Sequence, residues 1–277
     1  METGATFHAT GRVTSIAVDP TGGACGGAAC RIFVGTAGGG LWMTSDGGDT
    51  FTNISGILDP NPVYIGSYPQ TAVGSVALNT ATSPPTILLA TGEGNVGDSF
   101  WGDGIFSSGN LGQAWSHIAG SVNFNGQVLT AAEGEGFTKI AVDSTHSPPY
   151  VYAAATYTTG VNRAGLQGLN YGGPNFLGIW QSTDGGSTFA QYSVVKMGGC
   201  FAQGISGNTS IPCAGDDVVI DPLTNYVYAA VHDWFANSGS YAVMRSTDSG
   251  NTWTPLALPA IQERRGSRSP ACTSMLG

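Results

Sequence analysis

One short phrase recurs four times along the 277 residues of this chain. Each copy begins with Ser or Thr, carries Asp or Asn two residues later, continues through Gly and closes on Phe or Trp. The copies span residues 44–51, 108–115, 182–189 and 246–253. A short Asp side chain accepts hydrogen bonds from backbone N–H groups just after it, and Gly tolerates left-handed backbone. The phrase therefore predicts a tight turn, and we refer to the four copies as the repeat turns.

The acid or amide of each repeat turn marks the period of the chain. Asp46, Asn110, Asp184 and Asp248 follow one another at spacings of 64, 74 and 64 residues. Such a period indicates one supersecondary unit that recurs with loop insertions. Two strings rich in apolar and β-branched residues precede each repeat turn and are typical of strands, as at 13–18 and 31–36. Another strand is expected to begin at each closing aromatic residue.

The units favour an all-β fold. Four strands per unit and no helical periodicity predict radially arranged blades, a β-propeller. The 43 glycines and the charged fraction of only 10% agree with short strands joined by turns. We expect a propeller over 1–258 and an irregular tail over 259–277, with four four-stranded blades at about 12–57, 72–120, 137–195 and 216–258. Because natural propellers have about four to eight blades, this one is interpreted as a fragment or half of a larger propeller.

The phrase Ser/Thr-x-Asp-x-Gly-x-Thr-Trp/Phe resembles the Asp-box, or bacterial neuraminidase repeat. The resemblance extends over most of residues 4–256, although the second copy has Asn110 and Ala114 where the others have Asp and Thr. The family includes sialidases, xyloglucan hydrolases, sortilin-type receptors and a photosystem assembly factor. The resemblance implies that Asp46, Asn110, Asp184 and Asp248 are structural turn caps rather than catalysts, in agreement with their side-chain chemistry.

In a propeller of this topology the repeat turns lie on one face, and ligands are expected on the other, which we call the loop face. Its connections combine acids with aromatics in 92–103, 157–176 and 232–237. Sugar rings stack on aromatic side chains, and glycoside hydrolysis requires two carboxyl groups. The catalytic candidates are Glu93, Asp98 and Asp233, and the substrate-binding candidates are Trp101, Asp103, Arg163, Tyr171, His232 and Trp234.

A competing interpretation gives these residues no chemistry. Glu93 and Asp98 also suit the capping of glycine-rich turns, and Trp101 also suits packing between blades. A single exposed histidine such as His232 is commonly ordinary polar surface. Both interpretations remain open at the level of sequence.

A sialidase is the family member that the sequence disfavours. Its chemistry, as the resemblance implies, requires three arginines around a carboxylate and a tyrosine nucleophile. Arg31 begins a second strand and Arg245 adjoins a repeat turn, so both are expected on the wrong face, whereas only Arg163 is well placed. A net charge of -9 also disfavours an anionic glycan. A neutral polysaccharide or oligosaccharide is therefore the expected substrate.

The five cysteines predict disulfide clips more readily than a metal site. Cys25 and Cys30 enclose one small loop, Cys200 and Cys213 bracket another, and Cys272 is left over. No histidine lies near them in the sequence, which argues against zinc. We expect no metal and no cofactor.

The acidic charge argues against nucleic acid and anionic membranes as partners, because both are bound by basic patches. No apolar run approaches the roughly 20 residues of a membrane span. The first residues lack the basic start and apolar stretch of a signal peptide. We expect an extracellular or periplasmic protein whose leader is absent from this sequence.

Two functions from different classes remain. The first is a secreted glycan-active propeller that uses loop carboxylates to act on a neutral polysaccharide, in the manner of a glycoside hydrolase. The second is a non-catalytic module that binds a protein or a glycan, or assists assembly, through the same face. Self-association that completes a propeller is compatible with either one.

Overall fold

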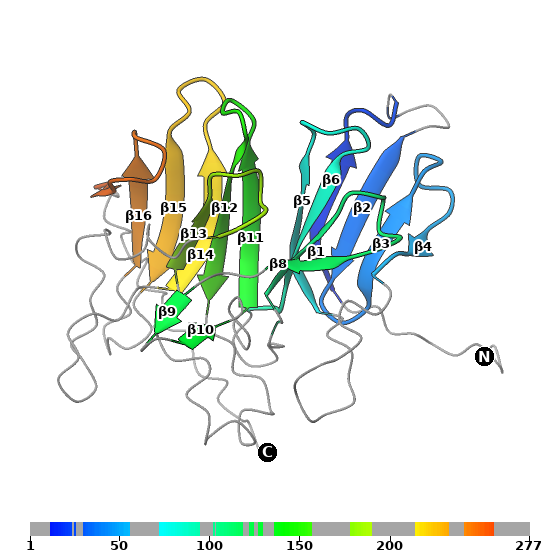
Figure 1. The fold of residues 1–277 in the computed structure, drawn as a ribbon, viewed down its shortest axis with the longest axis horizontal. Helices are drawn as coiled ribbons and strands as arrows, with labels where there is room; N and C mark the ends of the chain where they lie inside the picture. The colour runs from blue at the N-terminus through cyan, green and yellow to red at the C-terminus, as the bar shows by residue number, and fades with distance from the viewer. Residues whose placement is uncertain are drawn as a thin grey trace, which may run out of the picture.

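The computed structural model describes twelve parts of the chain: residues 12–23, 25, 30–55, 72–94, 102, 104–118, 122–124, 127–129, 136–156, 178–189, 214–232 and 241–257. Within them the fold is all-β, as predicted, and every sheet is antiparallel. Figure 1 shows the sheets standing side by side, with β1, β2 and β3 toward one end of the molecule and β14, β15 and β16 toward the other. No described helix is long and apolar enough to cross a membrane.

Four sheets form the blades, and in each one the strands pair in chain order. Blade 1 contains β1 (Val13–Asp19), β2 (Arg31–Thr36), β3 (Gly40–Thr44) and β4 (Thr52–Asn53). Blade 2 contains β5 (Val73–Asn79), β6 (Thr86–Thr91), β7 (Ile105–Ser108) and β8 (Ser116–Ile118). Blade 3 contains β11 (Gly136–Asp143), β12 (Tyr150–Thr156) and β13 (Gly178–Ser182). Blade 4 contains β14 (Ala214–Ile220), β15 (Val227–His232), β16 (Tyr241–Ser246) and β17 (Thr254–Pro255).

Two details differ from the expected pattern. Blade 3 has three strands in the described part of the chain, whereas a fourth strand was expected to begin at Phe189. A small hairpin of β9 (Val122–Phe124) and β10 (Gln127–Leu129) lies in the connection between blades 2 and 3. The sequence analysis did not predict this hairpin. The expected tail over 259–277 lies outside the described residues.

The first strand of every blade is the inner strand. Neighbouring inner strands contact one another in the order β1, β5, β11 and β14. Each carries a β-bulge at the same place, between Val13 and Ser15 in blade 1 and at the equivalent residues of the other blades. A bulge leaves one residue outside the ladder and bends the strand. The bulged residues Thr14 and Thr138 donate hydrogen bonds to the Val73 and Gly215 carbonyls of the next blade.

The core lies between the blades rather than within one sheet. One cluster, which includes Phe33 and Phe106, joins blades 1 and 2; a second, with Leu88 and Trp180, joins blades 2 and 3. A third cluster, with Tyr152, joins blades 3 and 4. Burying apolar area stabilises by about 25 cal/mol per Å². Neighbouring blades thus hold one another through these three clusters.

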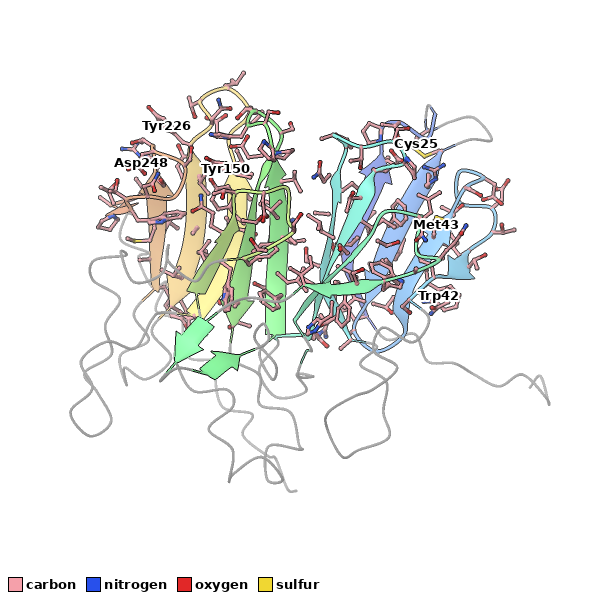
Figure 2. The ribbon with its side chains drawn as sticks, viewed as in Figure 1. Cys25, Trp42, Met43, Tyr150, Tyr226 and Asp248 are labelled. Carbon is pink, nitrogen blue, oxygen red and sulfur yellow. A yellow bond between two sulfur atoms is a disulfide. The ribbon has the colours of Figure 1, made fainter. Side chains whose placement is uncertain are left out.

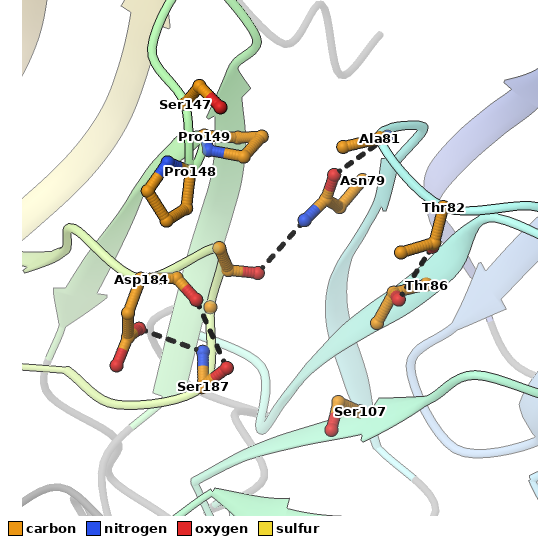
Figure 3. Close-up of a pocket in the computed structure, with 12 residues that line it drawn as sticks. Asn79, Ala81, Thr82, Thr86, Ser107, Ser147, Pro148, Pro149, Asp184 and Ser187 are labelled. Atoms are coloured by element: carbon orange, nitrogen blue, oxygen red, sulfur yellow. Dashed lines mark hydrogen bonds between the residues drawn. The ribbon is translucent and has the colours of Figure 1, made fainter.

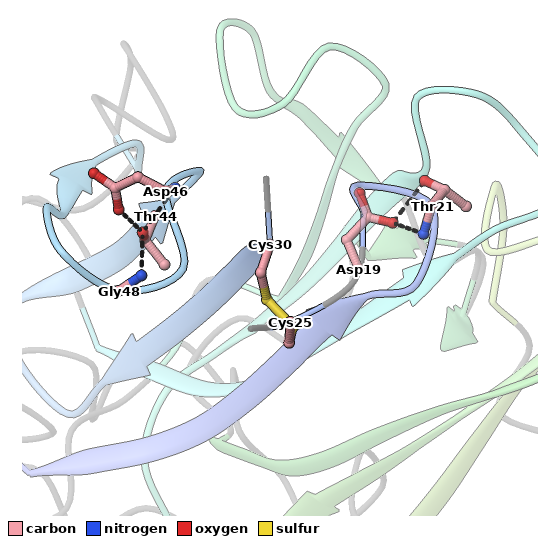
Figure 4. The surroundings of a disulfide bond; sticks show 7 residues. All are labelled: Asp19, Thr21, Cys25, Cys30, Thr44, Asp46 and Gly48. Carbon is pink, nitrogen blue, oxygen red and sulfur yellow. Dashed lines mark hydrogen bonds between the residues drawn. A yellow bond between two sulfur atoms is a disulfide. The ribbon is translucent and has the colours of Figure 1, made fainter. Parts of the chain in front are cut away.

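Each repeat turn is held by hydrogen bonds to side chains within the turn itself. In the first turn, the Thr44 hydroxyl donates to Asp46 Oδ1 over 2.6 Å and accepts from the Gly48 amide over 3.0 Å. Asp46 then accepts from the backbone N–H and the hydroxyl of Thr50. Gly47 and Gly48 have φ values of 83° and 115°, which only glycine adopts without strain. Figure 4 shows part of this network.

A disulfide joins Cys25 and Cys30 in the connection between β1 and β2, as the cysteine spacing predicted. Figure 4 places this bond between the first repeat turn and the turn around Asp19. The Cys30 carbonyl also accepts a hydrogen bond from the Gly47 amide. The disulfide therefore adjoins the repeat turn. The predicted Cys200–Cys213 clip lies outside the described residues.

Candidate functional site

The two ends of the blades carry different chemistry. Figure 2 shows Cys25, Tyr150, Tyr226 and Asp248 at the end that bears the repeat turns. The Gly185 amide of the third repeat turn bonds the Pro149 carbonyl, so each repeat turn sits beside the connection between the first two strands of its blade. The opposite end, the loop face, is where β6 and β15 finish and where β1 begins.

Most of the predicted site residues fall outside the described part of the chain. These are Asp98, Trp101, Asp103, Arg163, Tyr171, Asp233 and Trp234. Glu93 and His232 are described, and both lie at the loop face. They belong to blades 2 and 4, with blade 3 between them, so the described residues bring neither one directly to the other.

Glu93 follows β6 and is only 5% exposed. Its carboxylate forms an ion pair with the Arg12 guanidinium, which immediately precedes β1. The pair joins the second strand of blade 2 to the inner strand of blade 1. The next residue, Gly94, lies so close to Thr138 and Thr156 of blade 3 that an added Cβ would overlap their side chains. Glu93 is thus fixed where three blades meet at the loop face.

His232 ends β15 and is held by an acid that the sequence analysis did not select. Its Nδ1 atom lies 2.8 Å from both carboxylate oxygens of Asp216. The ring of Tyr241, directly across the ladder, lies 5.8 Å from the imidazole between centroids. A carboxylate at Nδ1 fixes the orientation of the imidazole and the tautomer that it adopts. Asp216, rather than the adjacent Asp233, is the described orienting group.

The acids of the repeat turns are occupied within their turns. Hydrogen bonds from Thr44 and Thr50 lower the pKa of the Asp46 carboxyl below its usual range. Burial raises the pKa of Asp184, but hydrogen bonds from Thr188 and Ser182 outweigh it and the pKa is lowered overall. Carboxylates held this way remain ionised at neutral pH, and both of their oxygens accept hydrogen bonds within the turn.

A groove of about 460 Å³ lies at the repeat-turn end, between blades 2 and 3. Figure 3 shows Thr82 and Thr86 on one side and Pro148, Asp184 and Ser187 on the other. Among the described residues, Asp184 is the one carboxylate in its lining, and none of them contributes an aromatic ring. The Asn79 side chain crosses the groove and donates to the Gly185 carbonyl over 3.1 Å. This groove has the composition of an interblade joint and lacks a sugar platform.

A Ser–His–Asp contact joins blades 3 and 4 at the same end. The Ser249 hydroxyl lies 3.3 Å from His146 Nε2, and His146 Nδ1 lies 3.1 Å from the buried carboxylate of Asp143. The equivalent place between blades 2 and 3 is taken by the hydrogen bond from Asn79 to Gly185. Because unrelated groups fill one position, we interpret this contact as an interblade tie. It is not assigned a catalytic role.

The two other arginines in the described part of the chain lie away from the loop face. Arg31 donates to Asp19 over 2.5 Å beside the disulfide, and Arg245 stacks over the ring of Tyr226. Among the described residues, no group of three His, Cys, Asp or Glu side chains is arranged to hold a metal ion.

Arg12 and Asp216 are the described loop-face residues that sequence reasoning did not assign to the site. Arg12 immediately precedes β1, and its pairing with Glu93 depends on how blade 1 sits against blade 2. Asp216 stands at the bulged position that holds Thr14 and Thr138 in other blades. Blade 2 has Gly74 at this position, so an acid where the other blades have threonine or glycine was the available indication.

Four antiparallel blades that pack through their inner strands define a partial β-propeller. The chain is similar to the GH74 xyloglucanase from Xanthomonas campestris, with a TM-score of 0.52 and 17% identity over 90% of this chain and 30% of that enzyme. It also resembles the GH74 enzyme from Niastella koreensis, with a TM-score of 0.45, 21% identity and coverage of 88% and 30%. An endo-arabinase from Bacteroides thetaiotaomicron aligns with a TM-score of 0.37, 10% identity and coverage of 82% and 75%.

The likeness to the Xanthomonas campestris enzyme shows the fold alone. The chain spans 30% of the length of each GH74 enzyme. No protein-family model matches the chain, and no curated protein matches it in sequence.

Proposed function

We propose that the chain is an Asp-box propeller unit of a glycan-active protein that acts on a neutral polysaccharide. The hydrogen bonds of the four repeat turns support the family, since hydroxyl, carboxylate or amide, and glycine take equivalent places in each. The neighbours of known structure are glycoside hydrolases. The net charge of -9 favours an uncharged glycan.

One observation carries the proposal: a buried carboxylate, Glu93, is fixed at the loop face. In this proposal Glu93, Asp98 and Asp233 supply the acid and base, and Trp101 and Trp234 form the sugar platform. Asp103, Arg163, Tyr171 and His232 bind hydroxyl groups of the substrate. Hydrolysis requires two carboxyl groups roughly 5 to 10 Å apart on either side of the glycosidic bond.

The first test substitutes Glu93→Gln and Asp233→Asn and measures release of reducing ends from xyloglucan, arabinan and mixed-linkage glucan. Loss of general acid–base catalysis lowers kcat by about 10²- to 10⁴-fold. Asp49→Asn is the matched control, because Asp49 is an exposed acid on the repeat-turn face. If both loop-face variants retain full turnover, the catalytic assignment is wrong.

Glu93→Gln also breaks an ion pair, so Arg12→Gln provides the second control. Both variants remove the same pair, but Arg12→Gln should lower Tm at least as much as Glu93→Gln, because it takes the positive charge away from a buried carboxylate, whereas Arg12 itself is half exposed. Only Glu93→Gln removes the carboxylate, so it alone should abolish turnover if Glu93 acts on substrate. Equal activities of the two variants would restrict Glu93 to a structural role.

The second candidate function is a non-catalytic module that binds a glycan or a protein through the loop face. The ion pair favours this binding module, because Arg12 binds the carboxylate of Glu93, which is the one predicted catalytic acid that the structure describes. Trp101→Ala should then abolish glycan binding in isothermal calorimetry while no polysaccharide is ever cleaved. The Cys25–Cys30 disulfide supports an extracellular or periplasmic location for either function.

A further inference from the structure

Each blade has a leading face, which points toward the blade before it, and a trailing face, which points toward the blade after it. The same leading position is filled by Val76, Ile140 and Val218 in blades 2, 3 and 4, and they are 4%, 2% and 0% exposed. Its counterpart in blade 1 is Ile16, which is 63% exposed. The side chain is of the same kind in all four blades, and only the preceding blade differs.

The rest of the leading face of blade 1 is apolar too. Val13 and Val18 flank Ile16 on the same side of β1, and both are exposed. Val34 pairs with Ile16, and Trp42 pairs with Val34, so these side chains continue the same face across the sheet. Contiguous exposed apolar surface of this kind marks an interaction site.

Blade 4 exposes the opposite surface. Val219 occupies the trailing position of Ala17, Ala77 and Ala141, which pack into the clusters between blades. Val219 is 48% exposed. On the same face, Tyr228 pairs with Val219, and Tyr241 at the end of the sheet is 74% exposed. The two ends of the arc therefore carry one leading and one trailing face.

Blade 4 and blade 1 also carry the acceptor and the donor of the hydrogen bond that joins neighbouring blades. The Ser15 hydroxyl accepts a hydrogen bond from the Val76 amide over 3.1 Å, and Ser75 accepts from Ile140 over 3.0 Å. In blade 4 the place of Ser15 is taken by Asp217, whose exposed carboxylate has acceptor capacity. In blade 1 the amide at the place of Val76 belongs to Ile16. An acceptor on the trailing face thus matches a donor on the leading face.

We propose that the leading face of blade 1 docks against the trailing face of blade 4 in a second copy of this chain. Each copy carries both faces in the same register, so the contact is head-to-tail, and two such contacts close a ring of two copies. Such a ring has about eight blades, within the natural range of about four to eight. This inference is independent of the proposed glycan activity.

The test is the solution mass, measured by light scattering and sedimentation velocity at about 100 µM chain. We expect twice the chain mass of 28.2 kDa. Ile16→Asp and Val219→Asp each place a charge in both contacts of the ring and should each yield a monomer. Losing one buried aliphatic side chain already weakens a contact by about tenfold or more. Both positions are exposed within one copy, so circular dichroism should show folded variants.

A mixture of the two variants provides the sharper result. An Ile16→Asp copy keeps a native trailing face, and a Val219→Asp copy keeps a native leading face. Together they can form one native contact, so the mixture should regain dimers that neither variant forms alone. Leu223→Asp is the control, because Leu223 is exposed in a turn outside both faces and should leave the mass unchanged.

Three outcomes would overturn the proposal. A wild-type monomer at this concentration means that another segment of the chain, adjoining blades of a longer protein or a different partner covers the faces. Dissociation by Ile16→Asp but not by Val219→Asp means that two blade 1 faces pair symmetrically. Dissociation by Leu223→Asp to the same extent means that the dimer uses another surface.

Discussion

At the scale of single residues, the repeat turns show how one carboxylate organises eight residues. Asp184 accepts from the Thr188 amide and hydroxyl and from the Ser187 amide. The second turn is a natural variant, since Asn110 keeps the bond from the Ala114 amide but has no hydroxyl partner there. Replacing the carboxylate by an amide therefore preserves the turn but removes part of its stabilisation.

Asp184→Asn should lower the free energy of unfolding by about 1 kcal/mol at neutral pH, since a hydrogen bond to a charged group contributes about 1.5 to 3 kcal/mol and this turn is partly exposed. The pKa of Asp184 is lowered in the folded state, so its contribution is full above the unfolded value near 4 and disappears as pH falls through the folded value. Thermal unfolding between about pH 7 and 2 measures the difference. If the difference in Tm between the wild type and Asp184→Asn stays constant down to about pH 2, the ionised carboxylate is not the source of the stabilisation.

At the scale of elements, the close approach of inner strands sets the packing of the blades. A Cβ added to Gly74 would lie 1.6 Å from the Phe137 carbonyl oxygen and 2.5 Å from that of Gly92. Both obstacles are backbone atoms, which cannot rotate aside as a side chain can. Gly74 therefore permits the contact of β5 with β11.

Gly74→Ala should destabilise the protein by about 3 kcal/mol, the upper end of the usual cost of overpacking. Gly109→Ala is the matched control, because an added Cβ there meets nothing within 4 Å. Urea unfolding followed by tryptophan fluorescence measures both changes. If the two variants unfold at the same urea concentration, β5 and β11 do not approach as closely as described.

The sequence predicted the elements well because each one follows from local chemistry. The strings at 13–18 and 31–36 became β1 and β2, and the Asp and Gly pattern identified every repeat turn. Contacts between blades were not predictable in the same way. The pairing of Glu93 with Arg12 joins residues 81 positions apart, and the contact of His232 with Asp216 depends on a bulge that shifts the register by one residue. The β9–β10 hairpin had an indication that was overlooked, because Asn125-Gly126 is typical of the two-residue turn that joins two antiparallel strands.

At the scale of the whole molecule, the proposed glycan activity and the proposed dimer together have one consequence. Two carboxyl groups must face each other across a glycosidic bond, and blades on opposite sides of a ring supply such pairs. A single arc of four blades places its predicted acids, Glu93 and Asp233, in blade 2 and after β15 of blade 4. Closing the ring with a second copy brings further loop-face acids around the same centre. Activity should therefore depend on assembly.

If both proposals hold, turnover per chain should rise with protein concentration in step with the fraction of dimer. Ile16→Asp should then lose turnover although Glu93 and its Arg12 partner are untouched, and mixing it with Val219→Asp should restore part of the activity along with one contact. Parallel measurement of mass and reducing-end release over about 0.1 to 100 µM separates the possibilities. Constant turnover per chain across the dimer transition would leave catalysis within one copy, whereas a dimer without turnover at any concentration would favour the binding module.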